Sequence, residues 1–172
     1  MTLLDAPKFD EVRERRNRII FSGSLGLVFI LLVTWWLVAG RPVDWPWNWN
    51  ASLFGRVTVN RFFQAIEKND LETAYGIWMH DKGWQQHPAQ HSGYPFARFQ
   101  KDWSPNSSDN DYGVIQTHRI AAASVRGNVL LVGIFINGRK SKAINLDYDP
   151  RDKTLNFSPE DVRFLEGPGG IQ

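Results

Sequence analysis

The chain has 172 residues, no cysteine, and 20 Lys and Arg against 18 Asp and Glu, which gives a formal net charge of +2. The absence of cysteine excludes disulfides, thiolate metal sites and cysteine nucleophiles. The pI near 9.0 is typical of nucleic-acid binding, but from residue 41 onward 15 cations face 14 carboxylates, so no nucleic-acid partner is expected.

An uncharged apolar stretch, residues 19–40, stands out in the N-terminal part. About 20 apolar residues are enough for a helix to cross ~30 Å of hydrocarbon, so this stretch predicts a transmembrane helix. It is apolar on all sides, which argues against a core helix. A cleaved signal peptide is the main alternative. Against it, the run is longer than a usual signal core, ends in Trp35 and Trp36, and lacks an Ala-x-Ala site.

The cations near the two ends of this stretch predict its orientation. Residues 1–18 form a leader with Lys8, Arg13, Arg15, Arg16 and Arg18, whereas only Arg41 and Arg56 follow the stretch closely. The leader is therefore expected in the cytoplasm, as a helical extension of the span. Everything after residue 40 is expected outside it, in a single-pass protein of the cell inner (cytoplasmic) membrane.

A tryptophan-rich juxtamembrane collar, residues 41–51, comes next. Indole prefers the headgroup level of a bilayer. The expected membrane-interface residues are therefore Arg16, Arg18, Trp35, Trp36, Trp45, Trp47 and Trp49. Pro42 and Pro46 disfavour a helix here, so an extended segment is expected. An aromatic strip for carbohydrate or a partner is the alternative function of the collar.

Residues 52–166 predict one extracytoplasmic domain, and residues 167–172 a frayed tail. A first helix, 52–68, is indicated by apolar residues at i, i+3, i+4 and i+7, namely Val59, Phe62, Phe63 and Ile66. Asp70 is expected to cap a second helix with a similar stripe. A polar loop, residues 79–94, separates it from a third helix.

The third helix is expected to start at Pro95 and to stop before Pro105. From Tyr112 the pattern changes to strands, at 114–126, 129–136, 139–148 and 154–158, with Leu155 and Phe157 pointing inward. The Asn137-Gly138 pair between two strand-like runs is a strong hairpin signal.

The predicted fold class is α+β: three N-terminal helices packed on a curved antiparallel sheet of about four strands, preceded by one transmembrane helix. Residues 129–136, VLLVGIFI, are apolar on both faces. This strand should therefore be central, with helices over one face. A protein partner or a second copy of the chain is expected over the other face.

Three features carry a family resemblance: the stretch VNRFFQAIEKNDLETAYGIW (59–78), the helix FARFQKDW (96–103), and the hairpins after Tyr112. In this order they resemble the nuclear transport factor two-like superfamily, which implies a cone-shaped α+β domain. The superfamily includes isomerases, dehydratases, hydrolases, ligand binders and scaffolds, among them membrane-anchored scaffold subunits of type IV secretion systems.

Enzymes of this superfamily hold an Asp, or an Asp–His pair, inside the cone as a base. On that resemblance the catalytic candidates are His80, Asp81, Asp102 and His118. The simpler interpretation is that Asp81 lies in a solvated loop and His118 faces solvent. The residues expected to line or fill the cone are Phe62, Tyr75, Trp78, Phe99 and Trp103. An open cone favours an enzyme, and a filled one favours a scaffold.

Neither a metal nor another cofactor is expected. His80, His87 and His91 suggest a metal site, but Pro88 and Gly93 oppose the helix that would bring two of them together. The leading hypothesis is a non-catalytic, membrane-anchored domain that binds a protein partner or small ligand at the membrane surface. The alternative is a small-molecule enzyme of isomerase, dehydratase or hydrolase type with an Asp or His base.

Overall fold

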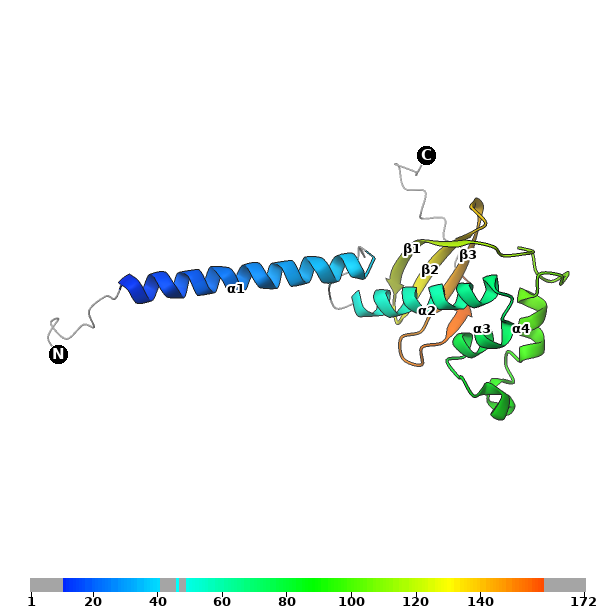
Figure 1. Cartoon of the computed structure of the whole chain (residues 1–172). Coiled ribbons are helices and arrows are strands. Elements are labelled where there is room, and N and C mark those ends of the chain that lie inside the picture. The colour runs from blue at the N-terminus through cyan, green and yellow to red at the C-terminus, as the bar shows by residue number, and fades with distance from the viewer. Residues whose placement is uncertain (1–10, 41–45, 47–48, 160–172) are drawn as a thin grey trace. The chain divides into compact units, whose positions relative to one another are not determined.

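A computed structural model of the chain describes residues 11–40, 46 and 49–159 (Figure 1). The chain divides into two compact units, residues 1–38 and 39–172. The described part of the first unit is a single helix, α1 (Glu11–Val38), of which Val12–Val38 is long and apolar enough to cross a membrane.

The hydroxyl side chains in the apolar part of α1 are satisfied by the backbone of the same helix. The hydroxyls of Ser22, Ser24 and Thr34 each donate to a carbonyl oxygen three or four residues earlier, at 2.8 Å. The helix includes residues 11–18 of the leader, and it ends at Val38 rather than at Gly40. Gly40 adopts a φ of +83°, a left-handed conformation that terminates helices.

The second unit begins with its helices. These are α2 (Trp49–Glu67), α3 (Leu71–Trp78), two short 3₁₀ helices η3 (Trp84–Gln86) and η4 (Pro88–His91), and α4 (Phe96–Trp103). The four apolar positions that predicted α2 are all buried. Asp70 caps α3 as expected, because its Oδ1 accepts a 3.1 Å bond from the Thr73 amide.

Two predicted helix boundaries need correction. The helix α2 starts at Trp49 instead of residue 52, so the end of the predicted collar is helical. Pro46 precedes α2, where a proline does not interrupt its hydrogen bonds. Pro95 is the N-cap of α4 and not its first helical residue. Trp45, Trp47 and most of the collar lie outside the described residues.

The four strands form one antiparallel sheet in the order β1 (His118–Arg126), β2 (Val129–Ile136), β3 (Arg139–Tyr148) and β4 (Leu155–Phe157). The β2–β3 turn is Asn137-Gly138, with φ of 50° and 71°, as a type I′ hairpin requires. A register shift between Ile120 and Ala122 bends β1. The α+β arrangement with an antiparallel sheet is therefore confirmed.

The first strand is shorter than expected because a distant side chain takes its hydrogen bonds. Asn137 Oδ1 accepts from the amides of Gln116 and Thr117 at 2.8 and 3.1 Å, and its Nδ2 donates to the Val114 carbonyl at 2.7 Å. These backbone groups are thereby occupied ahead of β1. The strand consequently begins at His118.

Leu155 is buried, as predicted, and Phe157 packs against the core rings of Trp78 and Trp103, although 45% of it remains exposed. One face of the Phe157 ring stacks on Trp103, with centroids 5.6 Å apart and planes at 8°. Within residues 49–159, β4 is the last strand in the sheet order and forms an edge of the sheet.

The core lies between the sheet and the helices, with α2 against β1 and β2 (Figure 1). Leu130, Val132 and Ile134 on β2 are fully buried on this face. Gly55 permits the close approach of α2, because a Cβ there would lie 2.4 Å from Leu130 Cδ2 and 2.9 Å from Tyr148 Cδ1.

The other face of β2 offers little free apolar surface among the described residues. Leu131 and Gly133 are buried, and the Arg119 guanidinium carbon lies 5.3 Å from the centroid of the Phe135 ring. A second copy on this face remains a prediction. The described large apolar side chains of the second unit that are exposed lie elsewhere, at Phe54, Val57, Val114 and Phe157.

Candidate functional site

The five side chains expected at the cone interior form a packed aromatic cluster. Phe62, Tyr75, Trp78, Phe99 and Trp103 are each at most 2% exposed. The Phe62 ring centroid lies 4.9 Å from that of Trp103, 5.2 Å from that of Trp78 and 6.2 Å from that of Phe99. The Trp103 and Phe99 rings pack edge-to-face on Phe62, at interplanar angles of 81° and 77°, and the Trp78 ring is tilted by 53°. The rings fill the space between the helices and the sheet rather than surrounding a cavity.

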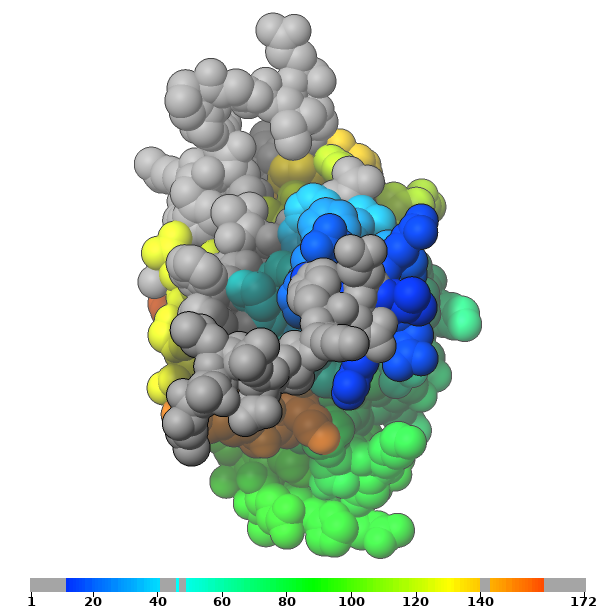
Figure 2. Space-filling model, turned by 90° about the vertical axis from the view of Figure 1, so that its left-hand side faces the viewer, coloured from blue at the N-terminus to red at the C-terminus, as the bar shows by residue number. Residues whose placement is uncertain are grey.

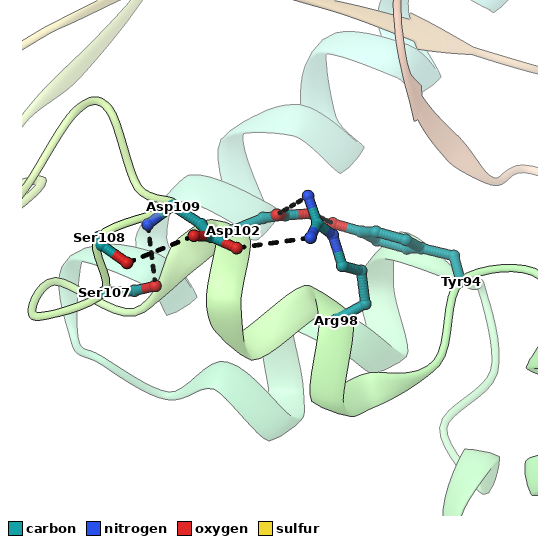
Figure 3. A network of polar contacts seen from close by, with 6 residues as sticks. All are labelled: Tyr94, Arg98, Asp102, Ser107, Ser108 and Asp109. Atoms are coloured by element: carbon teal, nitrogen blue, oxygen red, sulfur yellow. Dashed lines mark hydrogen bonds and ion pairs between the residues drawn. The ribbon is translucent and has the colours of Figure 1, made fainter.

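Asp102, on α4, is held by two side chains, one from the loop before α4 and one from α4 itself (Figure 3). The Tyr94 hydroxyl donates to its Oδ2 at 2.7 Å, and Arg98 Nη2 lies 3.0 Å from its Oδ1. Burial and the Asp102 bond both raise the pKa of Tyr94, so the hydroxyl stays protonated as a donor. Arg98 also reaches Asp109 at 3.4 Å. Both Asp102 oxygens are therefore used in structural contacts.

Asp81 is the centre of a small polar cluster in the loop after α3. Its Oδ2 lies 3.0 Å from His91 Nε2 and 3.6 Å from His87 Nδ1, and its Oδ1 accepts from the Gly83 amide at 2.8 Å. The His91 bond is the main reason that the pKa of Asp81 is lowered. Within residues 11–40, 46 and 49–159, no group of three His, Asp or Glu side chains is arranged to hold a metal ion.

Replacing Asp81 by Asn is expected to lower the urea unfolding midpoint at pH 7. The lowered pKa of the folded state means that ionised Asp81 stabilises the fold above its unfolded-state pKa of about 4. This stabilisation disappears as the pH falls through the lower folded-state pKa. The difference between the two proteins should therefore be full from pH 7 to about 5 and shrink below pH 4. Identical unfolding midpoints of the wild-type protein and the Asp81→Asn variant at pH 7 would contradict this stabilising role of Asp81.

His118 does not face solvent, in contrast to the simpler expectation. Its Nδ1 lies 2.7 Å from Glu67 Oε1, its Nε2 lies 2.8 Å from Asn60 Oδ1, and its ring stacks on Phe63 at 5.2 Å. The imidazole thus joins β1 to α2 with both nitrogens occupied. His118 therefore has a structural role in holding β1 against α2.

His80 is the one catalytic candidate with an exposed side chain beside a hollow surface. It follows α3 with a φ of +51°. Two hollows of about 690 and 470 Å³ share Thr58, Arg61 and His80 in their linings, and together they form a groove along the outer side of α2. We call this surface the α2 groove.

The α2 groove combines cations with apolar side chains. Arg61, Lys82 and Lys153 line it, whereas Glu72 is the only carboxylate in the two described linings. Its apolar part comprises Phe54, Val57, Ile77 and Trp84. Figure 2 shows the turn that carries Lys153, in orange-brown, bordering the green segment that follows α3.

The expected membrane-interface residues fall at helix ends wherever they are described. Arg16 and Arg18 are exposed near the start of α1, and Arg18 lies 3.6 Å from Glu14. Trp35 and Trp36 lie in the last turn of α1, and Trp49 is the first residue of α2. Arg16 and Arg18 thus precede the apolar part of α1 and Trp35 and Trp36 end it, whereas Trp49 belongs to the second unit.

Comparison with known proteins gives no matching protein-family model, no matching curated protein and no matching solved structure. The geometry of this chain is therefore the basis for its functional assignment.

The cations of the α2 groove were not among the site residues predicted from the sequence. Arg61 lies on α2, Lys82 follows α3, and Lys153 precedes β4, so no sequence motif joins them. One local signal was available, because Phe54, Val57 and Arg61 lie at i, i+3 and i+7 on α2. They form a second row beside the buried stripe.

Proposed function

We propose that the chain is a single-pass membrane protein whose second unit is a non-catalytic, extracytoplasmic binding domain of the nuclear transport factor two-like type. It binds a protein partner or a small ligand at the membrane surface. The filled aromatic interior carries this proposal, because a superfamily enzyme needs an open cone with a base inside it. Here the rings of Phe62, Trp78 and Phe99 occupy that space.

The environment of the candidate bases also supports a binding domain. The polar atoms of Asp81, Asp102 and His118 contact neighbouring side chains that tie loops and helices together. His80 lies in the α2 groove, which is open to solvent on one side of the domain. An open groove with both charged and apolar side chains suits recognition of another molecule.

The length of the connecting segment supports action close to the bilayer. Ten residues, 39–48, separate the end of α1 from the start of α2. Fully extended, this segment reaches about 40 Å at most. The start of α2 therefore lies within that distance of the end of α1, so the domain and whatever it binds are expected close to the bilayer.

The absence of natural cysteine allows a direct test of the anchor and its orientation. Thr2→Cys and Ser92→Cys place single thiols before and after the apolar helix, and Ser92 is exposed. A membrane-impermeant maleimide should label Ser92→Cys in spheroplasts at full length, and Thr2→Cys only after lysis. The reverse labelling pattern, or a mature protein lacking residues 1–38, would overturn the proposed topology.

A further inference from the structure

The α2 groove has the charge of an anion-binding surface. Arg61 lies where its two hollows meet, with Lys82 at one end and Lys153 at the other. No described carboxylate forms an ion pair with these three cations. The one carboxylate in the lining, Glu72, accepts a 3.4 Å bond from Gln85. The groove therefore has a net positive lining.

The same groove also contains apolar side chains that are exposed to water. Phe54 is 59% exposed and Val57 is 40% exposed, although both project from a helix whose other side is the core. Exposed apolar residues that gather beside cations are typical of surfaces that bind amphiphiles or membranes. A simple inorganic anion would use the cations and leave Phe54 and Val57 without a role.

We propose that the α2 groove binds an anionic phospholipid of the bilayer that holds the chain. The phosphate and headgroup lie against Arg61, Lys82 and Lys153, and the acyl part contacts Phe54 and Val57. This inference rests on the proposed function, because the short connecting segment keeps the groove within reach of lipid. The larger hollow, about 690 Å³, lies in the size range of small-molecule sites.

Binding is expected to depend on the three cations in steps. A Lys or Arg near an anionic membrane surface contributes about five-fold in affinity. Arg61→Gln alone should therefore weaken the interaction about five-fold, and the triple change of Arg61, Lys82 and Lys153 to Gln about 100-fold. A matched control, Lys68→Gln with Lys101→Gln and Arg151→Gln, removes the same charge outside the groove and should have little effect.

The test uses the full-length protein in nanodiscs with one protein each. An environment-sensitive fluorophore is attached at Val57→Cys, which is the only thiol in the chain. The discs contain either phosphatidylcholine alone or phosphatidylcholine with phosphatidylglycerol. Lipids carrying a doxyl quencher report contact between the probe and the acyl region.

We expect strong quenching in the anionic discs and weak quenching in the neutral discs. The strong quenching in the anionic discs should be lost in the triple variant of Arg61, Lys82 and Lys153. Equal quenching in both kinds of disc, or equal quenching in the groove and control variants, would overturn lipid recognition. A photo-crosslinker at Phe54 that captures a defined protein, without lipid adducts, would also overturn it while leaving the binding function intact. Failure of the thiol-labelling test would instead overturn the proposed membrane anchor and its orientation.

Discussion

Replacing Phe62 by alanine is expected to lower the free energy of unfolding by about 3–5 kcal/mol. Phe62 is fully buried and contacts four other aromatic rings, with centroid distances from 4.9 to 6.2 Å. The loss combines removed apolar burial, a cavity that the packed helices cannot close, and the edge-to-face contacts. Native domains have only about 5–15 kcal/mol of stability, so the variant should be close to unfolding.

Thermal unfolding of the full-length protein in mild detergent, followed by near-ultraviolet circular dichroism, measures this effect. The expected decrease in Tm is on the order of 15 °C. Phe157→Ala is the matched control, because it removes the same kind of ring from a partly exposed position on β4. The control should lose less than about half as much stability. A Phe62→Ala loss below about 1 kcal/mol would contradict a filled cone.

Two arginines in the middle of α1, Leu27→Arg with Ile30→Arg, are expected to abolish stable membrane integration. Each arginine near the centre of a span costs about 2.5–3.5 kcal/mol on insertion scales, and each lost Leu or Ile removes a further ~0.5 kcal/mol. The two changes together should make insertion about 6–8 kcal/mol less favourable. This exceeds what the remaining apolar residues of Val12–Val38 can offset.

Resistance to alkaline carbonate extraction measures the integration of α1. The wild-type chain should remain in the membrane pellet, and the double-arginine variant should leave it. Leu27→Ala with Ile30→Ala controls for side-chain removal at the same positions and should remain in the pellet. Retention of the arginine variant at the wild-type level would show that α1 is not what holds the chain to the membrane.

Local chemistry explains why much of the fold was predictable from the sequence. The i, i+3, i+4 pattern of α2, the Asp70 cap and the Asn137-Gly138 turn each act within a few residues. Their physical causes are visible in any short window of sequence. The helices and the antiparallel hairpins were therefore predicted with small boundary errors.

Contacts between distant residues explain what was missed. His118 was expected to face solvent, but its partners Glu67 and Asn60 lie 51 and 58 residues away. The strand β1 begins later than predicted because the amides of Gln116 and Thr117 donate to the side chain of Asn137, about 20 residues further on. Such contacts depend on the folded arrangement, which no local pattern encodes.

The α2 groove was missed for the same reason, and it is where a functional test is most direct. A photo-crosslinking amino acid at Phe54 of the full-length chain probes the groove in native membranes, and one at the exposed Asn156 of β4 is the control. A membrane-anchored binding domain with a specific site predicts a defined adduct from position 54, which the Arg61, Lys82 and Lys153 triple change removes, and none from position 156. Identical adducts from both positions, or none from position 54, would contradict it.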